Sequence, residues 1–123
     1  MTDHPNVAAA RGAYEAFSAG DTTALANRLA DDVIWHTIGG DTMNGASAVA
    51  ESMSGLAEYD VSLSVHDVVG NDDHVVALVA VTVQTEDGPF SYRTAEIYHM
   101  ADGKVTERWS FSDDTQAVVD FFS

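Results

Sequence analysis

The sequence predicts an α+β fold in which N-terminal helices pack on one face of a strongly curved antiparallel sheet. Apolar residues recur at helical spacing in the first third of the chain, whereas from residue 59 onward they alternate with polar ones. Polar turns separate the alternating runs, and this order of elements is the one expected when helices cover one face of an antiparallel sheet. The 123 residues show no shift in composition, so we expect a single domain over residues 1–123.

Three helices are expected before residue 57. The first has an apolar stripe at helical spacing, made of Val7, Ala10, Tyr14 and Phe17. The second is short, has Asp21 as its N-cap and repeats leucine at positions 25 and 29, and the third follows Gly45. Between the last two, residues 33–38 are β-branched and aromatic and end at a pair of glycines, which predicts a short strand.

The main sheet is expected from four further strands, at residues 59–69, 74–86, 90–100 and 105–111, with a closing helix over residues 115–122. The dipeptide at positions 102–103, Asp-Gly, is typical of a two-residue hairpin turn between the last two strands. Residues 75–83 are apolar at nearly every position, so we expect this strand to be buried on both faces.

The composition excludes several classes of function. Twenty acidic side chains stand against five basic ones, which gives a formal charge of −15, and such a field repels nucleic acid and anionic lipid. There are no cysteines, so disulfides, thiol catalysis and thiolate metal sites are excluded together. The first residues show no signal-peptide pattern, and no apolar run approaches the ~20 residues that a membrane helix needs. We therefore expect a cytoplasmic protein with no nucleic-acid or membrane partner.

Three stretches carry a family resemblance. They are AYEAFSAGDTTALANRLADDVIWH (residues 13–36), GASAVAESM (45–53) and EIYHMADGKVTERWSFSDD (96–114). A helix followed by "GD", an "ADD" leading into a strand with tryptophan, and a final "DGKV" hairpin occur in this order in SnoaL-like proteins. The chain resembles this branch of the NTF2-like superfamily along nearly its whole length.

The resemblance implies a cone-shaped fold, a homodimer, and a pocket between the helices and the sheet. Relatives of this kind include isomerases, cyclases, hydrolases and non-catalytic binding proteins, so the fold alone does not decide the function. In the ketosteroid isomerases that residues 33–38 resemble, the general base falls at Thr37, whose hydroxyl is too weak a base. Relatives also often carry an acid where this chain has Ser110.

Glu96 is the first candidate for chemistry. If the hairpin turn pairs Tyr98 with Glu107 and Glu96 with Trp109, both glutamates lie on an aromatic face of the sheet. A carboxyl group in such surroundings suits general acid or base catalysis, because desolvation disfavours its charged form. Glu107 lies nearer the turn and water, and Glu96 is nearer the middle of its strand, with Tyr14 and an arginine as the expected donors to it. The alternative is that one or both glutamates pair with Arg93 or Arg108, or reach solvent at the edge of the sheet.

Other residues remain open alternatives. If the opposite face of the last strand lines the pocket, Arg108 would orient a substrate oxygen there. His36 can act as a base or an acid near neutral pH, although its position next to the expected site requires a β-bulge; otherwise it is a surface or interface histidine. Tyr14 would donate a hydrogen bond to a developing oxyanion, or lie in the core with its hydroxyl satisfied.

We therefore expect a cofactor-independent isomerase, cyclase or hydrolyase that acts by proton transfer on a small hydrophobic, oxygen-bearing substrate. Its expected catalytic residues are Glu96, His36, Tyr14 and Arg108, and its expected substrate-binding residues are Phe17, Trp35, Tyr98 and Trp109. No metal is expected, because the five histidines show no ligand spacing. The alternative is a small-ligand-binding or dimerisation module without catalytic activity.

Overall fold

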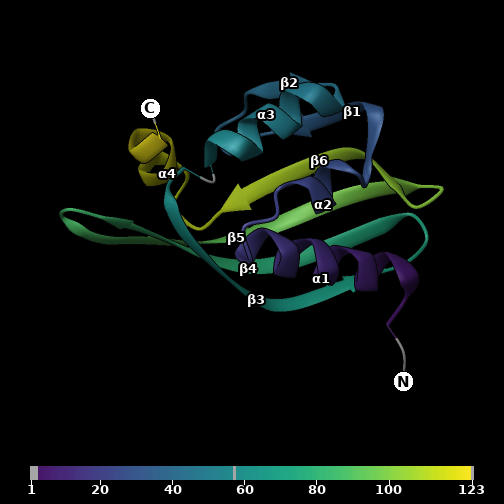
Figure 1. Ribbon diagram of the computed structural model, residues 1–123, viewed down its shortest axis with the longest axis horizontal. Helices are drawn as coiled ribbons and strands as arrows, with labels where there is room; N and C mark the ends of the chain where they lie inside the picture. The colour runs from purple at the N-terminus through teal and green to yellow at the C-terminus, as the bar shows by residue number, and fades with distance from the viewer. Residues whose placement is uncertain (1–2, 57, 123) are drawn as a thin grey trace.

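The structure, a computed structural model, describes residues 3–56 and 58–122, which form four helices and one six-stranded sheet. The elements in chain order are α1 (Pro5–Ser18), α2 (Thr23–Ala26), β1 (Leu29–His36), β2 (Thr42–Asn44), α3 (Ala46–Leu56), β3 (Asp60–Gly70), β4 (His74–Thr85), β5 (Gly88–Ala101), β6 (Lys104–Ser112) and α4 (Thr115–Phe122). The strands are arranged in the order β2-β1-β6-β5-β4-β3. In Figure 1, α1 lies over β3 and β4, α3 lies over β1, and α4 lies near one end of the sheet. The predicted α+β architecture is confirmed.

Local sequence explains where α1 begins and ends. Pro5 occupies the first turn, where its missing N–H is not needed, and the His4 side chain accepts a hydrogen bond from the backbone N–H of Asn6. Gly20 follows the helix with a φ of +92°, a conformation that suits glycine. The apolar stripe predicted for this helix turns toward the sheet, with Val7 buried and Tyr14 partly buried.

The sheet departs from an all-antiparallel arrangement in one place, because β1 pairs in parallel with β6. These two strands are far apart in the sequence, so no hairpin fixes their relative direction. β1 also begins at Leu29, four residues before the predicted strand, while α2 ends at Ala26 after a single turn. Leu29 therefore packs into the core from a strand, whereas the sequence predicts that it lies on a helix. The short strand β2 is a further element that the sequence does not predict.

The predicted turn between β5 and β6 is confirmed, with positive φ angles of 52° at Asp102 and 77° at Gly103. The register beyond it differs from the prediction. Met100 pairs with Val105 as expected, but the next pair is His99 with Glu107, so Thr106 is an extra residue in a β-bulge. The bulge reverses which face each later residue of β6 occupies.

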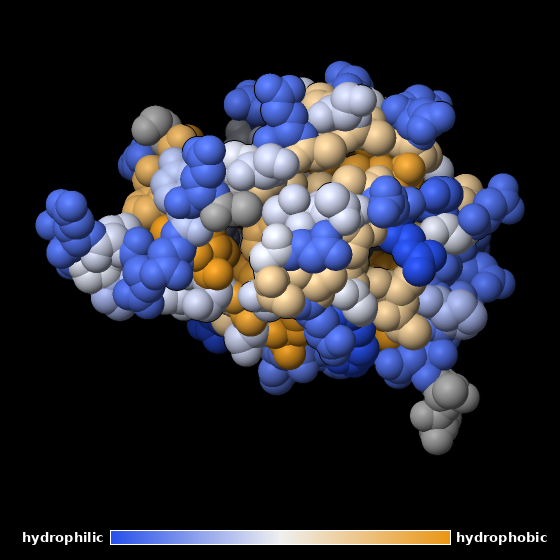
Figure 2. All heavy atoms as spheres, viewed as in Figure 1, coloured by the Kyte–Doolittle hydropathy of each residue, from blue (hydrophilic) through white to orange (hydrophobic). Residues whose placement is uncertain are grey.

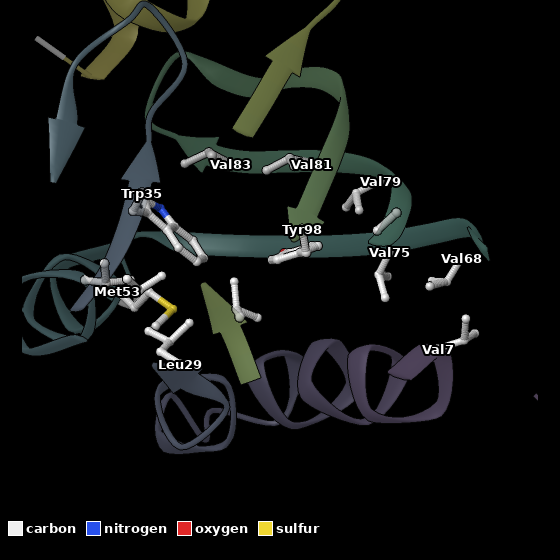
Figure 3. Close-up of a cluster of buried hydrophobic side chains, with 14 residues drawn as sticks. Val7, Leu29, Trp35, Met53, Val68, Val75, Val79, Val81, Val83 and Tyr98 are labelled. Carbon is white, nitrogen blue, oxygen red and sulfur yellow. The ribbon is translucent and has the colours of Figure 1, made fainter. Parts of the chain in front are cut away.

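The core lies between the helices and one face of the sheet. Alternate side chains of β4 supply much of it, and each is at most 6% exposed: Val75, Ala77, Val79, Val81 and Val83. Figure 3 shows several of these valines in a cluster with Trp35, Tyr98 and Met53. Within the single chain β4 is buried on one face only, since Leu78 on its other face is 41% exposed. Ile34 on β1 and Phe111 on β6 are also exposed, so this outer face of the sheet carries apolar side chains that are open to solvent.

Candidate active site

A cavity of about 760 Å³ separates the helices from the inner face of the sheet. Most of its walls are apolar side chains, which come from α1, α3, α4 and the strands. In Figure 2, apolar surface gathers over the region between α4 and the C-terminal end of α1. A cavity of this size and lining suits a small, largely apolar molecule.

Polar groups converge on Glu96 in the middle of this cavity. The hydroxyl of Tyr14, on α1, donates to Glu96 Oε1, and the hydroxyl of Tyr98 lies 3.1 Å from the same oxygen. Glu96 Oε2 accepts from Thr94 at 3.3 Å and from Arg108 at 3.2 Å. The Glu96 side chain is only 13% exposed, so these four donors replace the water that the carboxylate would otherwise bind.

Arg108 is held from three sides. One terminal nitrogen reaches Glu96, the other donates to the backbone carbonyl of His36 at 3.2 Å, and the guanidinium carbon lies 4.3 Å from the centre of the Trp35 ring. Trp35 and His36 are consecutive in β1, which runs parallel to β6 beside Arg108. Arg108 Nε is buried and has no hydrogen-bond partner among the described residues. Arg108 and Glu96 therefore form an ion pair that is held in a fixed position at the wall of the cavity.

Tyr14, Tyr92 and Tyr98 keep their protons at neutral pH. Burial, followed by the negative charge of Glu96, raises the pKa of Tyr14 and of Tyr98 well above the ordinary value. Burial also raises the pKa of Tyr92 to about 12. Burial alone would lower the pKa of Arg108, but Glu96 acting together with Tyr98 and Tyr14 outweighs the effect of burial, and the pKa is raised. The site therefore presents hydroxyl donors and a guanidinium beside one carboxyl group.

Six of the residues predicted from the sequence line the cavity: Tyr14, Phe17, Trp35, Glu96, Tyr98 and Arg108. Tyr14 and Tyr98 are linked directly, since their hydroxyl oxygens lie 2.7 Å apart. Trp35 meets Tyr98 edge to face, with ring centroids 6.2 Å apart, and Figure 3 shows both rings in the space between sheet and helices. Three of the expected catalytic residues and three of the expected substrate-binding residues therefore lie in one cavity.

His36 and Trp109 do not line the cavity, which corrects their predicted place in the site. The bulge at Thr106 turns Trp109 and Glu107 to the outer face of the sheet, and Glu96 pairs with Ser110 instead of Trp109. His36 lies on that outer face, where its Nε2 is 2.7 Å from Glu107 Oε2 and its ring stacks on Trp109. His36 therefore reaches the site only through its backbone carbonyl.

Some of the cavity's residues escaped the sequence prediction. Thr94 donates to Glu96 and shares its face of β5, so the alternation of β5 could have identified it. Tyr59 and Phe122 form an aromatic contact, with ring centroids 5.5 Å apart, at the part of the cavity near α4. No local pattern indicates this contact, because it joins the segment after α3 to the C-terminal helix. Arg28, which follows α2, also lines the cavity.

Two further properties concern the part of the chain that the structure describes. Among residues 3–56 and 58–122, no three histidine or acidic side chains come together in a way that could hold a metal ion. In the same residues, no helix is both long and apolar enough to span a bilayer.

Comparison with known proteins gives one family and a set of similar structures. The family model described as the SnoaL-like domain matches residues 10–108. Bal32a, from a soil-derived mobile gene cassette, is 19% identical with a TM-score of 0.86, over 97% of both chains. An LEH-like epoxide hydrolase of M. tuberculosis is 15% identical with a TM-score of 0.77, over 96% of this chain and 86% of that one. IdmH, a putative polyketide cyclase from Streptomyces antibioticus, is 20% identical with a TM-score of 0.77, over 98% of this chain and 100% of its own. Curated proteins gave no match.

Proposed function

The chain belongs to the SnoaL-like domain family, and from that premise we propose that it is a cofactor-independent isomerase, cyclase or hydrolyase acting by proton transfer. Its substrate is a small, largely apolar molecule that carries an oxygen. Structural similarity to an epoxide hydrolase and to a putative polyketide cyclase supports this range of reactions, but each name belongs to the neighbour alone.

The observation that carries the proposal is the cluster of polar groups in an otherwise apolar cavity. Glu96 can accept a proton, while Tyr14 and Tyr98 can donate hydrogen bonds, and Arg108 balances the charge. A base and oxyanion donors that meet inside a largely apolar pocket are the arrangement needed to remove a proton next to a carbonyl group.

The reaction follows from this geometry. A substrate oxygen beside the tyrosines accepts their hydroxyl protons in hydrogen bonds, which frees a lone pair on Glu96 from its donor. Glu96 then takes a proton from the carbon next to the substrate's carbonyl group, the electrons of that C–H bond form a C=C bond, and the C=O π electrons move to the oxygen, whose charge the hydroxyls and Arg108 stabilise. The raised pKa values of Tyr14 and Tyr98 keep them as donors throughout. Glu96 returns the proton at another carbon, or to the oxygen.

The alternative is a non-catalytic module that binds the same kind of ligand. Four donors already bind the carboxylate of Glu96, and this arrangement also fits an ion pair of Glu96 with Arg108 whose role is structural. The non-catalytic alternative is favoured again by Thr37, a cavity residue at the position where the resemblance to ketosteroid isomerases places the general base, because its hydroxyl donates to the carbonyl of Asp41 at 3.0 Å and is too weak a base.

Hydrogen–deuterium exchange separates the two functions. A panel of small apolar ketones is incubated with the protein in heavy water, and exchange next to the carbonyl group is followed by NMR. We expect catalysed exchange that Glu96→Gln abolishes and that Glu107→Gln, the same change on the outer face, leaves intact. Ketones that bind in the cavity without any catalysed exchange would refute the enzymatic proposal and favour the binding module.

A further inference from the structure

Arg28 is a basic side chain of the cavity wall that has no side-chain partner among the residues that the structure describes. The other four basic residues are engaged: Arg11 with Asp3 and Asp67, Arg93 with Asp113, Arg108 with Glu96, and Lys104 with the carbonyl of Asn27. Within residues 3–56 and 58–122, no hydrogen bond or ion pair engages the guanidinium of Arg28, which lines the cavity with an exposed side chain. In a chain with 20 acidic side chains, an arginine left without a carboxylate is unusual.

Arg28 lies at one end of the cavity. Its carbonyl accepts from the backbone N–H of Val105 at 2.8 Å, which places it beside the turn between β5 and β6. The cavity's other exposed charges lie at the opposite end, near α4. There Asp41 lies in the loop after β1, and Gly39 of the same loop lies close to Val119 of α4. Glu58 precedes Tyr59, whose ring contacts α4. The cavity therefore has a basic end and an acidic end.

The Glu96 cluster lies between these two ends. In the pairing of β1 with β6, the residue after Arg28 is opposite Val105, and Trp35 is opposite Arg108. On β5, the residues opposite Val105 and Arg108 are Met100 and Tyr98, which are about 7 Å apart along the strand, while Glu96 is about 13 Å from Met100. Because the guanidinium of Arg108 and the carboxylate of Glu96 meet between these positions, a ligand that reaches both Arg28 and Glu96 carries two polar groups roughly 10 Å apart.

We propose that the ligand of this cavity is an elongated apolar molecule with an acidic group at one end, and that Arg28 is the specificity-determining residue that binds this group. The ligand's reactive oxygen then lies at Glu96, as the proposed function requires, so the inference rests on that function. A guanidinium is suited to a carboxylate, because it offers paired donors and keeps its charge. The reverse orientation would place the acid next to Asp41 and Glu58, in a protein whose net charge already repels anions.

Calorimetric titration with a matched pair of ligands tests the inference. The pair is an acetylnaphthoic acid, with its two groups at opposite ends of the ring system, and the methyl ester of the same acid. We expect Arg28→Gln to weaken binding of the acid by about three- to five-fold at low salt, the range of an exposed ion pair, and to leave the ester unchanged. Arg93→Gln is the control, because it removes the same charge from an arginine that does not line the cavity. Added salt should reduce the effect of Arg28→Gln.

The outcomes distinguish the inference from the proposed function. If both ligands bind in the cavity but Arg28→Gln changes their affinities equally, the inference is wrong and the proposed function stands. If Arg93→Gln weakens the acid as much as Arg28→Gln does, the effect comes from net charge, and the inference is again wrong. If neither ligand binds to the wild-type protein, the proposed ligand class fails, and the role of Arg28 fails with it.

Discussion

The pair formed by Glu96 and Arg108 can be tested by removing each partner separately and then both together. Their side chains are 13% and 11% exposed, and the closest nitrogen and oxygen lie 3.2 Å apart. At that distance, with an effective dielectric constant of about 20, the attraction is about 5 kcal/mol, most of which offsets the loss of hydration. Removing one partner leaves a buried charge without its counter-ion, which costs about 3–5 kcal/mol. We expect about 3 kcal/mol for Arg108→Met, because three hydroxyl donors still reach Glu96.

Urea unfolding, followed by tryptophan fluorescence, measures these costs. The variants are Glu96→Gln, Arg108→Met and the double substitution, since glutamine keeps the shape of Glu96 and methionine is an apolar side chain that replaces most of the length of Arg108. We expect the double variant to be more stable than the sum of the single losses predicts, with a coupling energy of at least about 2 kcal/mol. Arg93→Gln, which breaks an exposed pair with Asp113, should lose far less stability than either single variant.

Additive losses in the double variant would refute this account of the site. So would single variants that each lose less than about 1 kcal/mol, which is the range of a solvent-exposed ion pair. In either case the guanidinium and the carboxylate would not depend on each other, and Arg108 could not be the group that balances the charge of Glu96 during proton transfer.

Three further predictions concern pH, assembly and metals. The pKa of Tyr92 is raised to about 12, and those of Tyr14 and Tyr98 are raised well above the unfolded value of 10.0. Their contribution to stability is therefore complete below pH 10 and lost as the pH rises through 12, and a urea midpoint that stays constant over this interval would contradict it. The exposed outer face of the sheet predicts a homodimer, so light scattering should give a dimer mass that Leu78→Lys reduces to that of a monomer; a wild-type monomer at tens of micromolar would count against this interface. Ligand binding should survive treatment with a chelator, and a loss that added metal restores would overturn the metal-free mechanism.

The sequence predicted the site to the extent that local patterns determine it. Tyr14 follows from the helical stripe of α1, and Glu96 from the alternation of β5, so both were placed on the correct faces. The position of Trp109 depends on the single extra residue at Thr106, which no turn signal marks, and one bulge exchanges the two faces of the rest of β6.

The prediction of which sheet face lines the pocket is wrong for the aromatic residues of β6. The sequence predicts that an aromatic strand face lines the pocket, yet Trp109 and Phe111 lie on the side without helices. In this fold both faces of the sheet carry apolar side chains, so apolar character alone does not identify the inner one. The sequence alone leaves two places open for His36, in the pocket or on the surface. The structure places it on the outer face, because its neighbour Trp35 takes the inward position on β1.

The cavity has a consequence for the stability of the folded chain. A space of about 760 Å³ between α1 and β4 leaves their apolar side chains without contacts that a filled core would give them. A molecule that fits this space supplies those contacts and acts as part of the hydrophobic core. Because it binds only the folded state, a ligand at 100 times its dissociation constant raises the free energy of unfolding by about 2.7 kcal/mol. The melting temperature of this protein therefore reports on its natural ligand before any reaction is known, and compounds can be ranked by how far each one raises it.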